Sequence, residues 1–270
     1  MKYFVVISLL IVAAGCDSPP AQESQPEPPV EKEPSDQEEF MADEPIQLPE
    51  LLTYGALRQI NLHDDYSSAT TVGEVREKGA VPNHGVGALG ELSGEITLWG
   101  DELYLAHAGE PVQFESVAFA AADEELEATL FFAAAVDEWE EIEPFGAADL
   151  AAMEEGLANW RDDHELEGAI PFRIIDPRAT VEWHVVDADL LPEEGASSCG
   201  ERKEYAHQFK EDDEPVRLVG LFTTDHTGVV VDHTTSLHVH VITDDGRSGH
   251  VDEVRLSDEA VIEIGRSWLL

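Results

Sequence analysis

Three histidines in the last part of the chain have the spacing of a metal site. Residues 236–250 read SLHVHVITDDGRSGH. Apolar residues alternate around His238 and His240, which predicts a strand on which both histidines share one face. The loop Asp244-Asp245-Gly246 suits a three-residue hairpin turn with Gly246 in the left-handed conformation, and this turn sets His240 opposite His250. Three neutral imidazoles with open positions left over are how proteins hold a catalytic divalent metal.

Two other interpretations of these histidines stay open. A histidine on a strand is usually structural, although two on one face beside a third across a hairpin are less often so. A two-residue Asp-Gly turn would also remove the site, because His240 would then face Val251 and His250 would point to the opposite face. The metal hypothesis therefore depends on the three-residue loop.

The charge of the chain is extreme. Its 270 residues include 58 acidic and 15 basic side chains, which gives a net charge of −43. A hydrophobic content of 43% supplies enough apolar surface for one large domain or two small ones. Phosphate recognition needs Lys and Arg, so we expect no nucleic-acid partner. The acidity indicates either a solvated, halophile-like surface or a sink for cations, and its spread along the chain favours the surface.

The first residues have the pattern of an export signal. Lys2 precedes the apolar run Phe4–Ala14, which is too short to span a bilayer stably. Residues 13–16, AAGC, resemble the bacterial lipoprotein cleavage box, in which the cysteine becomes the lipidated first residue. We therefore expect a signal peptide over 1–16 and a lipid anchor on Cys16 that tethers the exported protein to a bacterial membrane, facing the periplasm or the cell exterior. Ordinary secretion with a different cleavage site is the alternative.

Residues 17–50 differ in composition from the rest of the chain. They are rich in Pro, Glu, Gln and Ser and poor in apolar residues, which cannot offset the entropy of ordering, so we expect a disordered acidic linker. Cys199, in the sequence SSCG, has no intramolecular disulfide partner once Cys16 is lipidated, and we interpret it as a loop residue. The folded part is then expected over 51–270.

The patterning of the folded part predicts an α+β protein. The capping box Thr71–Glu74 begins a short helix that Gly79 ends, and an apolar stripe from Leu150 to Trp160 predicts a second helix. Strands are expected over Gly94–Trp99, Glu102–Ala106, Val112–Phe119, Ala128–Val136, Ala169–Asp176, Thr180–Val186, Val216–Thr224, Gly228–Val231, Ser236–Thr243, His250–Leu256 and Ala260–Ile264. We expect two sheet-rich halves, about 51–165 and 166–270, with a mixed sheet in the first and an antiparallel barrel-like sheet in the second.

Three segments, taken in order, resemble one known family. Residues 85–95, GVGALGELSGE, resemble its glycine-rich approach to a Gly-Glu strand, and LVG at 218–220 with Gly228 resembles its approach to a metal-binding strand. The hairpin from His238 to His250 resembles its metal hairpin, with a loop one residue shorter. From about Leu51 to the C-terminus the chain therefore resembles the alpha-acetolactate decarboxylase family.

The resemblance implies a function and a set of residues. The family uses three histidines and a glutamate to hold a divalent metal, usually zinc, and the matching positions are His238, His240, His250 and Glu95. It converts acetolactate, a small 2-hydroxy-3-oxo acid, into acetoin and carbon dioxide without an organic cofactor, and its members form a two-part fold and a homodimer. The residues suit this chemistry. A metal chelated by the ketone and hydroxyl oxygens stabilises the electron pair left by loss of carbon dioxide, and a carboxyl group such as Glu95 can deliver the proton.

Two departures from the family concern turnover. The position of an active-site arginine falls on His184, which lacks the bidentate guanidinium that grips a carboxylate, so we expect His184 to line the pocket and limit the enzyme. Arg173 and Arg247 are alternative cations. The family also has a proton-transfer glutamate near its C-terminus, for which the sequence up to Leu270 has no counterpart.

The leading functional hypothesis is a metal-dependent acetolactate decarboxylase tethered outside the cytoplasmic membrane. The second is a metal-binding lipoprotein of the same fold that has lost turnover, which the two departures favour. The third is a decarboxylase for another 2-hydroxy-3-oxo acid. An assay for acetoin separates the first hypothesis from the others.

Overall fold

The computed structural model describes residues 46–78, 80–144, 146, 149–192 and 203–267. The chain divides between Asp43 and Glu44, and all described residues belong to the second unit. The signal peptide expected over 1–16, its lipidated Cys16, Cys199 and most of the linker expected over 17–50 lie outside the described residues. No helix in the described ranges is long and apolar enough to span a membrane.

The first sheet has seven strands, and all its pairings are antiparallel. The strands are β1 (Leu51–Tyr54), β2 (Thr70–Thr71), β3 (His84–Leu89), β4 (Gly94–Trp99), β5 (Glu102–His107), β6 (Gln113–Ala118) and β7 (Glu127–Ala134). Their order is β1-β7-β3-β4-β5-β6, with β2 also on β7. The expectation of a mixed sheet in this half is therefore wrong. Short links such as Gly100-Asp101 between β4 and β5 permit only antiparallel neighbours, because a parallel pair needs a crossover of about a dozen residues.

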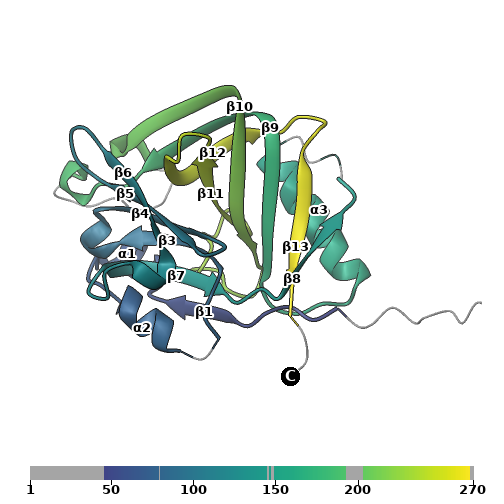
Figure 1. Cartoon of the computed structure of the whole chain (residues 1–270), viewed down its shortest axis with the longest axis horizontal. Helices are drawn as coiled ribbons and strands as arrows, with labels where there is room; N and C mark the ends of the chain where they lie inside the picture. Colours follow the sequence, from purple (N-terminus) through teal and green to yellow (C-terminus); the bar gives the residue numbers. More distant parts are fainter. Residues whose placement is uncertain (1–45, 79, 145, 147–148, 193–202, 268–270) are drawn as a thin grey trace, which may run out of the picture. The chain divides into compact units, whose positions relative to one another are not determined.

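The second sheet has six strands, four of which close into a ring (Figure 1). The strands are β8 (Glu138–Ile142), β9 (Ile170–Val185), β10 (His207–Phe222), β11 (Leu237–Thr243), β12 (Ser248–Arg255) and β13 (Val261–Arg266). The order is β10-β11-β12-β9-β13-β8, and β10 also pairs with β9, which completes the ring of β9 to β12. The expected α+β class with two sheet-rich halves is confirmed, and the second sheet is antiparallel and ring-like.

The element boundaries differ from expectation in three places. β8 precedes the expected boundary near residue 165 but joins the second sheet through β13. β9 is one continuous strand where two were expected, because the long β10 pairs with it along its whole length. Register shifts on either side of Glu214 keep the two strands paired across the interruption that the sequence suggested. Gly228–Val231 is a turn and not a strand, since Gly228 has a φ of 75° and its N–H bonds to the carbonyl of Val231.

Three α-helices accompany the sheets in the described part of the chain. They are α1 (Leu57–His63), α2 (Val72–Glu77) and α3 (Leu150–Asp163), and short 3-10 turns occur at Gly90–Leu92, Phe119–Ala121, Ala188–Leu190 and Lys203–Tyr205. α2 begins with the expected capping box, in which Thr71 and Glu74 exchange hydrogen bonds. It ends at Glu77, and the expected stop at Gly79 lies outside the described residues. α3 matches the expected helix, with Met153 and Leu157 buried.

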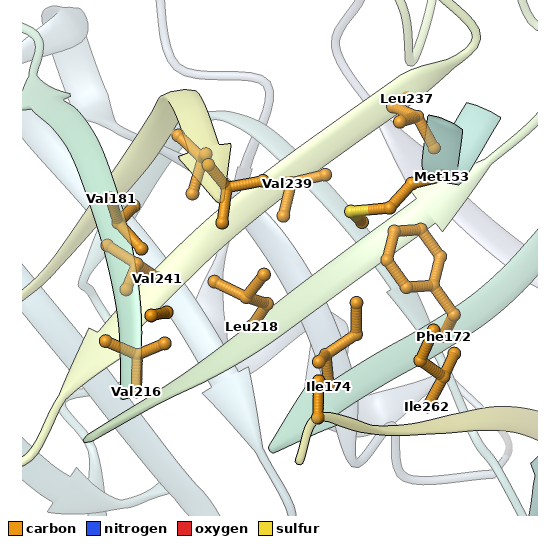
Figure 2. Packing of buried hydrophobic residues seen from close by; sticks show 14 of the residues in the cluster. Met153, Phe172, Ile174, Val181, Val216, Leu218, Leu237, Val239, Val241 and Ile262 are labelled. Atoms are coloured by element: carbon orange, nitrogen blue, oxygen red, sulfur yellow. The ribbon is translucent and has the colours of Figure 1, made fainter. Parts of the chain in front are cut away.

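The alternation along β11 separates an apolar core from the histidines. Leu237, Val239 and Val241 point into a core that side chains from β9, β10, β13 and α3 complete (Figure 2). His238 and His240 therefore take the opposite face of β11, which faces the first sheet. A second cluster of buried apolar residues from both sheets packs on that side. The fold thus places the histidines between the two sheets.

Candidate metal and active site

The hairpin that carries the histidines has the expected register. His240 on β11 lies directly opposite His250 on β12. The Thr243 N–H donates to the carbonyl of Arg247 at 2.9 Å, and Gly246 has a φ of 84°. This is the three-residue loop predicted from the sequence, so the alternative two-residue turn is excluded.

The three imidazoles converge on one point. One ring nitrogen from each of His238, His240 and His250 lies within 4.8 Å of the others. The ring centroids are separated by 5.0 to 5.6 Å. His238 and His240 are buried, and His240 is 0% exposed. This arrangement can hold a metal ion, since imidazole nitrogens are ligands for zinc and other divalent transition metals.

Hydrogen bonds on the far side of two rings orient them toward that point. Nδ1 of His238 donates to the carbonyl of Val230 at 2.8 Å. Nδ1 of His240 shares a hydrogen bond of 2.8 Å with the Thr97 hydroxyl, which also contacts the Ser248 hydroxyl. Both rings therefore present Nε2 to the cluster, and partners of this kind are typical of metal-binding histidines.

Nε2 of His240 supports the fit of a metal ion. It is buried and has no hydrogen-bond partner among the described residues. A buried polar nitrogen left unpaired costs about 1–3 kcal/mol, so such atoms are rare unless something else binds them. The donor set and this unpartnered nitrogen both suit a divalent ion.

The charge state of the cluster also suits a ligand role. Burial lowers the pKa of His238 to about 4. Burial, followed by the neighbouring imidazoles, lowers the pKa of His240 and of His250 well below the usual range. The rings are therefore neutral at neutral pH, which leaves their nitrogen lone pairs available.

Glu95 reaches the cluster from the first sheet. Its Oε2 lies 3.7 Å from Nε2 of His240, and its Oε1 accepts a hydrogen bond of 3.2 Å from the Val186 N–H. Its neighbours across β3 and β5 are Ala88 and Ala106, small residues that leave room for its side chain. Burial is the main cause that raises the pKa of Glu95 well above its ordinary value. The carboxyl group therefore favours its protonated form.

His184 lies next to the cluster on β9. It is paired directly with His250, their ring centroids are 5.1 Å apart, and its Nδ1 lies 2.9 Å from Oδ2 of Asp252. The two alternative cations lie elsewhere. Arg173 pairs with Glu263 and stacks on Trp139, and the guanidinium of Arg247 pairs with Asp245 and Glu211 on another surface. Neither arginine lines the cavity at the histidines, so that expectation is corrected.

A largely apolar cavity of about 130 Å³ opens beside the cluster. Its polar lining includes Glu95, His184, His238 and His250. Its apolar wall comprises Leu57, Ile60, Leu92, Leu130, Val186, Val230, Val231 and Leu237. No Lys or Arg in the described ranges lines it.

Several parts of the site escaped sequence reasoning. α1 supplies Leu57 and Ile60, whose three-residue spacing was a detectable helical signal. The Val230 carbonyl and the Val186 N–H bind His238 and Glu95 with backbone atoms. Every residue type has such atoms, so the sequence does not reveal these contacts.

The fold and the buried histidines define an α+β protein with a candidate metal centre between two antiparallel sheets. Solved structures share this fold. The fold is that of alpha-acetolactate decarboxylases. The Bacillus subtilis strain 168 enzyme matches with a TM-score of 0.60 at 17% identity, over 81% of this chain and 86% of that one. The enzyme from Bacillus subtilis subspecies spizizenii gives the same values. A Staphylococcus aureus protein of unknown function, similar to alpha-acetolactate decarboxylase, matches with a TM-score of 0.58 at 17% identity, over 80% and 85% of the two chains.

No protein-family model and no curated protein matches the sequence. The structural comparisons confirm the resemblance expected from the sequence at the level of the fold.

Proposed function

We propose that this protein is a metal-dependent decarboxylase that converts 2-acetolactate into acetoin and carbon dioxide. The observation that carries the proposal is the buried cluster of His238, His240 and His250, with Nε2 of His240 unpartnered, on a fold shared with acetolactate decarboxylases. Three histidines at this point match a catalytic zinc site that leaves a position for substrate, so zinc is the metal we propose.

The reaction needs charge stabilisation and one proton. The bond between the carboxylate carbon and C2 breaks, carbon dioxide leaves, and the electron pair remains at C2 beside the ketone until a proton is added there. A bound divalent ion would supply Lewis-acid stabilisation of that negative charge through the ketone and hydroxyl oxygens. The neutral rings of the three histidines leave the positive charge of such an ion largely uncompensated, which suits this chemistry.

Glu95 and His184 are the residues we assign to substrate chemistry. Glu95 is held by the Val186 N–H beside Nε2 of His240, and its raised pKa keeps a proton available for delivery to C2. The alternative role for Glu95 is that of a fourth metal ligand, which requires the ionised carboxylate and excludes proton delivery by this group. His184, oriented by Asp252 through Nδ1, borders the same cavity and can donate a hydrogen bond to a substrate oxygen. The apolar residues of the wall offer water no hydrogen-bond partners, which favours these interactions.

The cellular setting is part of the proposal and rests on the sequence. The apolar run Phe4–Ala14 followed by AAGC supports export and a lipid anchor on Cys16, with residues 17–50 as the tether. The resemblance to the family supports a homodimer.

A second candidate is a metal-binding lipoprotein of this fold without turnover. The observation that favours it is the cavity itself, which has His184 where the family has arginine and no Lys or Arg in its described lining. A decarboxylase for another 2-hydroxy-3-oxo acid is a third candidate, supported by the large apolar share of the wall.

The test is an acetoin assay with the metal content known. The purified chain is loaded with zinc, incubated with racemic 2-acetolactate, and acetoin and carbon dioxide are quantified. Matched controls are the same protein treated with chelator and the double variant His238→Ala/His240→Ala. Equal amounts of both products, lost in both controls, support the proposal. Stoichiometric zinc without acetoin above the uncatalysed rate selects the second candidate.

A further inference from the structure

A second cavity meets the first one at the histidines. It has a volume of about 340 Å³ and lies beside the first turns of α3, where Leu150, Ala151 and Glu154 line it. His184, Thr235, Leu237 and His250 line both cavities. The imidazoles of His184 and His250 therefore face two spaces of different character, one largely apolar and one that includes charged residues.

Lys203 supplies the cation that the first cavity lacks. It lines the second cavity and is the one Lys or Arg in the described lining of either space. Its Nζ lies 3.9 Å from Oδ1 of Asp252, which is longer than a hydrogen bond, and the side chain is 40% exposed. The other carboxylate oxygen of Asp252 is bound by Nδ1 of His184 at 2.9 Å. The ammonium group, with its three donors, is therefore available to an anion in this cavity.

Two acidic side chains share this space with Lys203. Asp252 is bound by His184, and Glu154 accepts hydrogen bonds from the Thr235 hydroxyl at 3.2 Å and from the Ser236 N–H at 2.8 Å. Both carboxylates are thus engaged by neighbours of the cavity.

We propose that the second cavity is a carboxylate subsite and that Lys203 binds the substrate carboxylate there. This inference rests on the proposed function and assigns an orientation to the substrate. The ketone and hydroxyl oxygens lie at the histidines, the alkyl groups occupy the apolar first cavity, and the carboxylate points past His184 and His250 toward Lys203. Lys203 then takes the recognition role of the family's arginine, whose position holds His184 in this chain.

Binding of two unreactive probes to the zinc-loaded protein tests this orientation. The first is 2,3-dihydroxy-2-methylbutanoate, which keeps the carboxylate but has no ketone and does not decarboxylate. The second is acetoin, which keeps the two metal-facing oxygens but has no carboxylate. We expect Lys203→Gln to weaken binding of the acid about tenfold and to leave acetoin binding within about twofold, measured by titration calorimetry. Lys203→Arg should retain the affinity for the acid.

Lys210→Gln is the matched control, because Lys210 is an exposed lysine that pairs with Glu182 and lines neither cavity. It should bind both probes like the parent. Unchanged binding of the acid by Lys203→Gln, or an equal loss for both probes at unchanged zinc content, overturns the subsite. Lysine-dependent binding of the acid without turnover of acetolactate supports the subsite and refutes only the decarboxylase function. A parent protein that binds neither probe refutes both.

Discussion

Glu95 and His240 come from different sheets and face each other across 3.7 Å, between Oε2 and Nε2. Burial raises the pKa of Glu95 well above its ordinary value and lowers the pKa of His240 well below its own, because it disfavours the charged form of each group. Nε2 of His240 also lacks a hydrogen-bond partner among the described residues. A divalent cation at this point would bind Nε2 of His240 and favour the ionised form of the Glu95 carboxylate.

We expect one divalent ion per chain, and the double variant His238→Ala/His240→Ala should lose it. Both residues contribute to the cluster whose nitrogens lie within 4.8 Å of one another, and two of three imidazoles cannot be replaced by water without loss of affinity. Elemental analysis of the purified proteins measures the content. His107→Ala, which removes an exposed histidine on β5, is the control. A double variant with the parent's metal content would show that the ligands are other residues.

Thr97→Val should weaken metal binding and, because it leaves the buried Nδ1 of His240 and the Ser248 hydroxyl without this partner, should lower the free energy of unfolding by about 1–3 kcal/mol. The Thr97 hydroxyl orients His240 through Nδ1 at 2.8 Å, and valine keeps the shape of the side chain without that contact. Loss of such an orienting group typically weakens metal affinity about 10- to 100-fold. Competition with a chromophoric chelator measures the affinity. Thr53→Val, at an exposed position of the same sheet, should leave it unchanged. Equal affinities for the two variants would refute the orienting role.

His84→Gln should reduce the loss of stability that the protein suffers in acid. Burial is the main cause that lowers the pKa of His84 to about 4, and Nε2 of this residue bonds to the carbonyl of Gly220. Because the folded pKa is below the unfolded value of about 6.5, the unfolded chain gains the proton first. The related stability is therefore present above pH 6.5 and is lost as the pH falls toward 4.

The expected difference can be measured by denaturant unfolding in the presence of chelator. Between pH 7 and pH 4.5 the free energy of unfolding should fall about 2 kcal/mol more for the parent than for His84→Gln. Parallel pH profiles for the two proteins would mean that His84 titrates normally in the folded state.

His184→Arg should increase acetoin formation at neutral pH. A guanidinium binds a carboxylate with two parallel charge-assisted hydrogen bonds, and an imidazole ring lacks that bidentate geometry. Asp252, 2.9 Å from Nδ1 of His184, can pair with the new side chain and hold it at the wall of the cavity. We expect a gain in kcat/KM of about tenfold, which corresponds to about 1.4 kcal/mol of transition-state binding. A folded, metal-loaded variant without a gain would argue against a role of this position in substrate binding.

The protein should melt at a higher temperature in molar salt than in dilute buffer. A net charge of −43 repels itself in the compact state, and salt reduces the range of that repulsion to about 3 Å at 1 M. Thermal unfolding followed by circular dichroism at several chloride concentrations measures the midpoint. A midpoint that is unchanged or lower in salt would show that the acidic surface does not destabilise the fold.

The sequence was informative where structure is local. The loop Asp244-Asp245-Gly246 and the alternation around His238 and His240 were enough to predict the register of the hairpin, because turn geometry and strand periodicity act over a few residues. The capping box at Thr71 and the stripe on α3 were predictable for the same reason.

Long-range pairing accounts for most of what the sequence did not predict. β8 belongs to the second sheet because it pairs with β13, more than a hundred residues later, and no local pattern encodes that choice. The cation beside the site was missed for the same reason. Arg173 and Arg247 were the candidates from the sequence, but Arg173 on β9 and Arg247 in the loop before β12 both lie outside the lining of the two cavities, whereas Lys203 lines the second one.

The closed ring of β9, β10, β11 and β12 restrains the register of each strand and so allows the sequence to change widely. A slip of one residue between two of these strands would turn one set of side chains to the wrong face and would have to be matched around the whole ring. His184, His250 and His240 lie side by side on three of its strands, so their alignment is fixed both by the hairpin loop and by closure of the ring. Substitutions elsewhere on the sheets can therefore accumulate without displacing the imidazoles. The distances between the imidazoles are set by the closed ring of strands, so they can persist while many of the other residues in these strands are substituted.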